Sequence, residues 1–305
     1  MKLAAAHDTV TLPLPAAIRL RSAADRRLVD AGLEIDASPV AGMRKPVRLG
    51  RVPSGVWVAH VLPGTGARVA NDATTWGASA TPYRFAVDDA WGRFLPLRLS
   101  AALPFRGAVR WAGWSGWTDA RRGQARPILL PGADPATIPD YLPLFPGPGW
   151  KPEPGLADVR AQLAIRETGG ALRNAGWAVA TVGLGGTTIG LGVADGEGRL
   201  VVAFPYPALP DQTPAEAAQG RPLIAWSVSV QVHCGELAVG LAAGGVPELQ
   251  SILAQLDSPP LRALATIVGA QAPLPDQQLV LGRTLVLRTE ISAGKPSSSL
   301  FLKSP

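Results

Sequence analysis

Apolar and polar residues alternate along most of this 305-residue chain in short runs. A period of two residues is typical of strands with one buried face. Glycine and proline, 34 and 30 residues, fall between these runs and favour turns. The sequence therefore predicts a mainly β protein with strands at Ile18–Arg21, Gly32–Asp36, Val56–Val61, Tyr83–Val87, Arg93–Leu103, Val159–Ile165, Gly176–Leu184, Thr187–Val193, Arg199–Phe204, Ile224–Val232, Leu279–Ile291 and Leu300–Leu302.

One run has a helical rather than a strand period. Between residues 246 and 256, Pro247 stands where a first helical turn tolerates proline. The apolar residues that follow recur at a spacing that places them on one helix face, namely Leu249, Ile252, Leu253 and Leu256. We expect one short C-terminal helix near residues 247–256.

The distribution of prolines predicts a division into segments. Residues 1–12 are expected to form an N-terminal arm and residues 13–126 a first β-sandwich domain. Residues 127–154 are rich in proline and glycine, and the stretch from Phe145 to Trp150 suits neither a regular helix nor a central strand. We expect a linker there, followed by a second β-sandwich domain at residues 155–305 that contains the helix and the closing strands.

Two short patterns occur in the same order in each half. Residues 28–35 and 172–179 share Leu-x-x-Ala-Gly-apolar-x-β-branched, and residues 87–94 and 193–200 share Val-x-Asp-x-x-Gly-Arg-apolar. In the second pattern, the Asp is expected to cap a tight turn and the Gly to adopt a positive φ before the strand resumes. The order of the patterns predicts an internal duplication.

These patterns resemble the carboxypeptidase regulatory-like, or transthyretin-like, β-sandwich. The turn from Ala194 to Gly198 is similar to the Ala-Asp-x-x-Gly turn of that family, which is a non-catalytic module. The first copy departs from the pattern through an insertion between Ile35 and Tyr83. The resemblance implies two tandem Ig-like or transthyretin-like sandwiches.

The whole layout also resembles β-sandwich proteins of phage tail-like contractile injection systems. The stretches that carry this resemblance are Pro53–Trp57, Leu62–Gly64, Gly92–Pro96, Phe204–Pro207 and Leu285–Thr289. It implies a structural subunit at the baseplate, cap or tube end, present in multiple copies, which contacts other subunits of a large assembly. Such a subunit would be made in the cytoplasm and then join the particle. The alternative is a surface or carbohydrate-binding β-sandwich module.

Composition narrows the classes of partner. Charged residues make up only 17% of the chain and hydrophobic residues 47%, which suits a protein that buries surface in an assembly. The formal net charge is +6, but the basic residues are scattered, so no nucleic-acid partner is expected. The chain has no apolar run long enough to span a membrane, and its single cysteine excludes an intrachain disulfide.

Few residues are candidates for chemistry. The only candidates for a nucleophilic pair are Cys234 with His233 or His60. Adjacent strand residues point to opposite faces, which argues against pairing of Cys234 with His233. Asp88 and Asp89 are expected to serve a turn rather than a metal. The sequence therefore predicts no enzyme activity, no metal site and no cofactor.

The nine tryptophans are the most distinctive feature of the composition. Aromatic residues are enriched at protein interfaces, although core packing and carbohydrate binding remain open. The candidate interface residues are Trp111, Trp114, Trp117 and Trp150.

Overall fold

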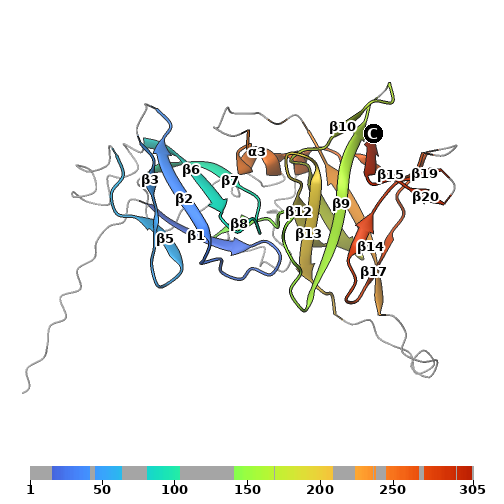
Figure 1. Cartoon of the computed structure of the whole chain (residues 1–305), viewed down its shortest axis with the longest axis horizontal. Helices are drawn as coiled ribbons and strands as arrows, with labels where there is room; N and C mark the ends of the chain where they lie inside the picture. The colour runs from blue at the N-terminus through green and yellow to red at the C-terminus, as the bar shows by residue number, and fades with distance from the viewer. Residues whose placement is uncertain are drawn as a thin grey trace, which may run out of the picture.

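In the computed structural model, the described residues form two β-rich lobes that lie side by side, with the short helix α3 between them (Figure 1). The structure describes residues 16–41, 45–63, 81–103, 141–167, 169–208, 224–235, 237, 245–267, 271–292 and 294–303. The prediction of a mainly β protein is confirmed.

The first lobe is built from two four-stranded sheets. One sheet has the order β4 (Gly50–Arg51), β5 (Val56–Ala59), β1 (Ala16–Ser22) and β8 (Leu142–Leu144). The other has the order β3 (Val47–Arg48), β2 (Leu33–Pro39), β6 (Thr81–Asp89) and β7 (Leu97–Leu103).

Period-two alternation accounts for the buried face of β1. Alternate residues from Ala16 to Ser22 are buried, and the residues between them are partly exposed. The buried side chains pack into one apolar cluster with those of the facing sheet, among them Ile35 and Phe85, both with no exposed surface. At about 25 cal/mol per Å² of buried apolar surface, such a core is the main source of the lobe's stability.

The second lobe pairs a four-stranded sheet with a nine-stranded one. The smaller sheet has the order β12 (Thr187–Val193), β11 (Val179–Leu184), β14 (Ala225–His233) and β17 (Gln277–Val280). The larger follows the path β10 (Leu172–Asn174), β9 (Leu156–Arg166), β21 (Leu300–Lys303), β15 (Arg262–Thr266), β19 (Glu290–Ser292) and β20 (Lys295–Pro296). Off this path, β13 (Arg199–Pro205) and β18 (Leu285–Leu287) pair with β9, and β16 (Ala272–Pro273) pairs with β15.

Strand β9 is the organising element of the second lobe. Its first half runs between antiparallel β13 and parallel β18, and its second half between β10 and β21. Most residues of β9 are therefore buried. Val159 and Leu163 have no exposed surface. The predicted closing strand Leu279–Ile291 is in fact divided among β17, β18 and β19.

The predicted helix is confirmed as α3 (Leu249–Ala254), which continues into the 3₁₀ turn η2 (Gln255–Asp257). Its buried residues Leu249, Ile252 and Leu253 fall on the predicted apolar face. A helix of six residues has little intrinsic stability in water, so packing must hold it in place. Its buried face belongs to the core cluster of the first lobe.

The two Asp-x-x-Gly-Arg turns have the same geometry. The carboxylate of Asp89 accepts hydrogen bonds from the backbone N–H of Arg93 (2.6 Å) and from its guanidinium. Asp195 accepts the matching bonds from Arg199 (2.8 Å to the backbone nitrogen and 2.7 Å to Nε). The glycine that precedes each arginine has a positive φ, +65° at Gly92 and +83° at Gly198. The predicted roles of Asp and Gly are confirmed in both turns.

Cross-strand pairing also matches around these turns. Ile35 lies opposite Val87, and Val179 lies opposite Val193. The sequence patterns align Ile35 with Val179 and Val87 with Val193, so equivalent residues face each other in both lobes. The predicted hairpin at residues 185–186 is present as well, since both glycines have a positive φ between β11 and β12.

Candidate functional site at the junction of the lobes

The described part of the predicted linker is built into the junction of the two lobes. Strand β8 pairs in parallel with β1, placing Leu142 opposite Leu20. Beyond the strand, Leu95 donates its backbone N–H to the carbonyl oxygen of Phe145, and Gly147 donates to that of Arg93. We predicted a linker here because the segment is rich in proline. Its prolines gave no indication that its apolar residues anchor it.

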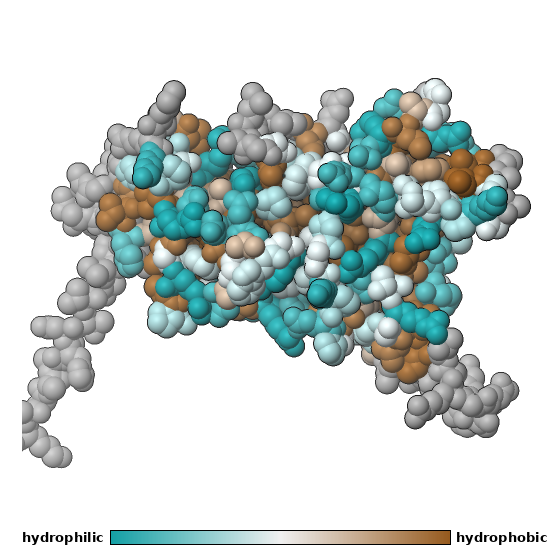
Figure 2. Space-filling view, viewed as in Figure 1, coloured by the Kyte–Doolittle hydropathy of each residue, from teal (hydrophilic) through white to brown (hydrophobic). Residues whose placement is uncertain are grey.

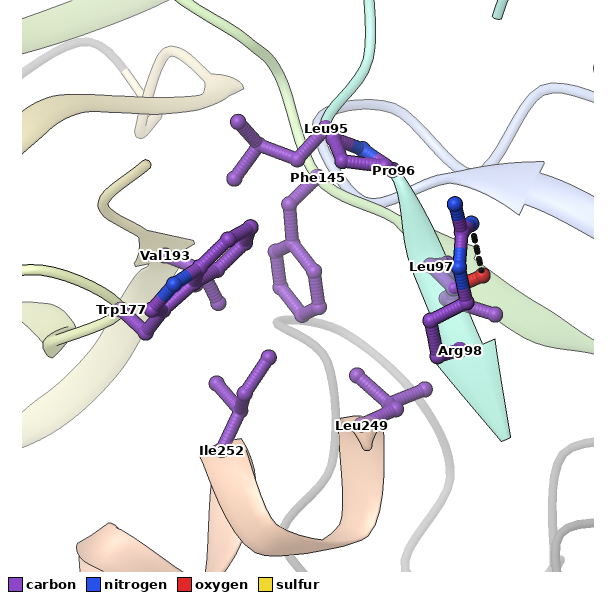
Figure 3. A pocket seen from close by; sticks show the side chains of 9 residues that line it. All are labelled: Leu95, Pro96, Leu97, Arg98, Phe145, Trp177, Val193, Leu249 and Ile252. Atoms are coloured by element: carbon purple, nitrogen blue, oxygen red, sulfur yellow. Dashed lines mark hydrogen bonds between the residues drawn. The ribbon is translucent and has the colours of Figure 1, made fainter. Parts of the chain in front are cut away.

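Phe145 lies at the centre of an apolar contact between the lobes (Figure 3). Its ring, 4% exposed, points toward Ile252 of α3, with Trp177 of the second lobe beside it. Buried residues of both lobes belong to one continuous cluster, which includes Val179, Leu191 and Val193 from the second lobe. The space left at this contact is about 10 Å³, room for roughly one water molecule.

Polar contacts fix α3 to both lobes. The Ser100 hydroxyl donates to Glu248, 2.7 Å, just before the helix. At its other end, the buried Gln255 amide donates to the carbonyl oxygen of Trp177 and accepts from the backbone N–H of Gly235 (2.8 and 2.9 Å). These bonds tie the helical segment to β7 of the first lobe and to loops next to β11 and β14 of the second lobe, so the helix bridges the two lobes.

Trp150 is the one candidate interface tryptophan within the described residues. It is buried, with 7% of its surface exposed, and packs with Ala24 of the first lobe and with Val201 and Ala203 on β13. Its contacts therefore lie inside the chain, between the two lobes. Trp111, Trp114 and Trp117 lie outside the described residues.

Arg160 on β9 holds the connecting segment against the second lobe. Its guanidinium donates to the carbonyl oxygen of Trp150 (2.8 Å) and to the buried carboxylate of Asp158 (2.8 Å). Asp158 also accepts from the Thr284 hydroxyl, 2.9 Å, next to β18. A planar guanidinium suits this role, since it can donate to several fixed oxygens at once.

A polar hollow of about 160 Å³ lies beside Trp150. Three segments line it: residues 22–31 of the first lobe, the turn residues Arg93 and Phe94, and the connecting segment between Trp150 and Leu156. Across the hollow, Arg27 forms an ion pair with Glu153, 2.7 Å, which joins the first lobe to the connecting segment. We call this site the junction hollow.

The charged groups of the junction hollow are held by ion pairs at its rim. Arg27 also contacts Asp25 (3.2 Å), and Asp30 pairs with Arg51 (2.7 Å). The Arg93 guanidinium donates to the carbonyl oxygen of Ala31 at 2.6 Å. Exposed ion pairs of this kind contribute only about 0–1 kcal/mol each, so they join the segments around the hollow weakly.

The histidine and cysteine candidates are not brought together. His233 ends β14 and is buried, and its Nδ1–H donates to the carbonyl oxygen of Ser258, 2.8 Å. Burial lowers the pKa of His233 and raises that of Cys234, which contacts Arg173 instead. His60 is exposed in the other lobe, at the end of β5. His233 and Cys234 thus contact different residues.

Neither a metal cluster nor a membrane-spanning helix is found among the described residues. No group of three or more His, Cys, Asp or Glu side chains converges there. Of Asp88 and Asp89, the first pairs with Arg98 (3.0 Å) and the second caps its turn. No helix in this part of the chain is long and apolar enough to cross a membrane.

Sequence reasoning did not identify the junction hollow. Its lining residues run from Ser22 to Leu156 in the chain. Two of its segments overlap the repeated patterns at residues 28–35 and 87–94, but neither pattern indicates a hollow. No family model, no curated protein and no solved structure matches this chain.

Proposed function

We propose that this protein is a non-enzymatic structural subunit of a phage tail-like contractile injection particle, at its baseplate, cap or tube end. The observation that supports the proposal is the fixed joint between the lobes. Domains in one chain move relative to each other by default unless their interface is large and hydrophobic. Here Phe145, Trp150 and α3 fill the interface with apolar side chains.

A fixed joint suits a subunit that must hold two neighbours at a constant distance. A particle that contracts transmits force through its subunits, and a flexible linker would absorb that force. Two sandwiches locked together present binding surfaces in a constant relative orientation. The low proportion of charged residues, 17%, is consistent with surfaces that become buried in an assembly.

The exposed surface offers several separate contacts rather than one large patch. On the face in Figure 2, hydrophilic residues cover most of both lobes and hydrophobic residues occur in small groups. Large exposed apolar side chains occur on both lobes, the most exposed being Val61, Trp91 and Leu172 at 72%, 63% and 54%. Small contacts with several neighbours fit a subunit present in multiple copies.

The lobes themselves we interpret as diverged copies of a transthyretin-like sandwich. The matched Asp turns and the matched pairs Ile35–Val87 and Val179–Val193 support a common origin. That fold is used as a binding module, so the interpretation fits a role without catalysis. Fold alone does not carry function.

The test is co-sedimentation with an assembled particle. The full chain, tagged in the organism that encodes it, should pellet with contractile particles and be located by gold labelling at one end. A Phe145→Ala variant, which loosens the joint, should accumulate but pellet less. A wild-type chain that stays monomeric and remains in the supernatant of every particle preparation would sink the proposal.

A further inference from the structure

The junction hollow has features that the proposed scaffold role does not require. A joint between lobes is most stable when it is closely packed, yet this one leaves about 160 Å³ open beside Trp150. The apolar contact around Phe145, by comparison, leaves about 10 Å³. Ligand sites occur preferentially at domain junctions and combine an apolar wall with a few fixed polar groups.

The lining places acceptors and donors side by side. Glu153 and Asp30 each use one carboxylate oxygen, Oε2 and Oδ2, in an ion pair with an arginine. Within the described part of the chain, no hydrogen bond engages their other oxygens. Arg27, with 73% of its side chain exposed, presents further guanidinium donors at the same rim. Phe94 is partly exposed and lines the hollow, and Trp150, which is 7% exposed, adds only a small apolar surface.

This combination discriminates between classes of ligand. A multiply charged anion would face the carboxylates of Asp25, Asp30 and Glu153, and a polycation would face Arg27 and Arg93. A neutral polyhydroxylated ring can donate to the carboxylates, accept from the guanidiniums and lay its C–H surface on the aromatic wall.

We propose that the junction hollow binds a neutral carbohydrate, one pyranose ring of a glycan. The size of the hollow suits roughly one such ring. Glu153 and Asp30 accept hydroxyl hydrogen bonds, Arg27 donates, and Trp150 and Phe94 bound the apolar side. The inference does not depend on the particle assignment, because a scaffold subunit and a free surface module can each carry a sugar site.

Trp91 extends the site beyond the hollow. The Arg93 guanidinium, which lines the hollow, also lies 4.3 Å from the centre of the Trp91 ring. Trp91 is 63% exposed. The equivalent residue in the second lobe is Glu197, so the turn forms without an aromatic residue at this position. A second sugar ring leaving the hollow past Arg93 would meet this indole. We therefore expect disaccharides to bind more tightly than monosaccharides.

The test is ligand-observed NMR on the full chain with methyl α-glucoside, methyl β-galactoside, N-acetylglucosamine and maltose as probes. We expect saturable binding of at least one probe with a Kd of about 1 mM, typical of a single-ring site. Glu153→Gln and Asp30→Asn, both at exposed ion pairs, should keep the fold and weaken binding about tenfold. Glu197→Gln alters the equivalent surface turn of the second lobe, outside the hollow, and should leave binding unchanged.

Three results would overturn the inference. The first is the absence of saturable binding of every glycoside up to the solubility limit. The second is equal affinity in the wild type and in the Glu153→Gln and Asp30→Asn variants. The third is tighter binding of inorganic phosphate or spermidine than of any glycoside, with loss of that binding in the same variants. Thermal unfolding of each variant shows whether the fold is retained.

Discussion

The two lobes contain the same turn, yet the chain leaves it in different directions. After Asp195, residues 199–205 cross to the facing sheet as β13 and pair with β9. After Asp89, only Arg93 to Leu95 follow this path, alongside the segment of Phe145. At Pro96 the chain turns back, and β7 pairs with β6 in the same sheet. A proline lacks the N–H that a continuing ladder needs.

The insertion between Ile35 and Tyr83 supplies a strand in place of the one that is lost where the chain turns back at Pro96. Its strand β5 pairs antiparallel with β1, the position that β13 occupies next to β9. On the other side of β1, β8 pairs in parallel, as β18 does with β9. The first strands of the two lobes, β1 and β9, therefore have similarly arranged neighbours, although these neighbours come from different parts of the sequence. Spatial position is retained where chain order is not.

The largest expected effect tests whether the lobes are one cooperative unit. Replacing Phe145 with Ala removes a buried ring from the core that both lobes share and should lower the free energy of unfolding by about 3–5 kcal/mol. It should also separate the unfolding of the two lobes, seen as two transitions in urea, and expose residues 146–155 to proteolysis. Phe204→Ala, in the core of the second lobe alone, is the control.

The result that contradicts a shared core is a single transition in Phe145→Ala with no new cleavage. The lobes would then remain joined through Trp150, Arg160 and the contacts of α3. Combining Phe145→Ala with Arg160→Ala would in that case show whether the polar clamp suffices.

The second prediction concerns the glycines of the two turns. Both have a positive φ, which costs other residues about 1–2 kcal/mol. A Cβ at Gly198 would also lie 2.6 Å from the carbonyl oxygen of Leu163, whereas at Gly92 it meets nothing within 4 Å. In thermal or urea unfolding, Gly198→Ala should therefore cost about 1–3 kcal/mol more than Gly92→Ala. Equal losses of stability in the two variants would show that the backbone near Leu163 moves to accommodate the new Cβ at no cost.

Local features of this fold could be predicted from the sequence, because nearby residues determine them. The alternation around Ile18 predicts a strand, and the spacing of Asp89, Gly92 and Arg93 predicts a turn that the structure contains in both lobes. The apolar face from Leu249 to Leu256 predicts a helix. Each of these signals lies within about ten residues.

Long-range pairing could not be predicted in the same way. Nothing local to Phe145 shows that its ring enters a core, because the surrounding prolines and glycines are typical of exposed chain. Nothing local to β5 shows that it lies beside β1 rather than in the facing sheet. The junction hollow depends on both, since it forms only where Arg27, Arg93 and Glu153 come together.

The third prediction removes the cap of one turn. The Asp89 side chain is 1% exposed. Burial opposes its ionisation, but hydrogen bonds from Arg93 and from the Phe94 backbone, together with the charge of Arg93, outweigh burial and lower its pKa. Asp89→Ala should cost about 2–3 kcal/mol at pH 7, because it leaves Arg93 and the backbone N–H groups without their acceptor. Asp195→Ala, which removes the matching bonds, should cost a similar amount in the second lobe.

Acid should weaken the same cap. A carboxyl group with a lowered pKa in the folded state stabilises the fold above the ordinary Asp pKa, and this contribution is lost as pH falls below about 4. The wild type should therefore lose more stability than Asp89→Asn between pH 5 and pH 2.5, measured as the shift in Tm. Asp88→Asn, at an exposed ion pair, is the matched control and should follow the wild type.

The smallest expected effect is a pH dependence of stability near neutral pH, which should arise in the second lobe and not in the first. Burial lowers the pKa of His233, so the unfolded chain binds a proton at a higher pH than the folded chain does. Stability should therefore decline as pH falls below about 6.5 and level off once the folded state is protonated too. His233→Gln should flatten this decline in Tm, whereas the exposed His60→Gln should not. An equal decline in Tm in the wild type and in His233→Gln would contradict this assignment.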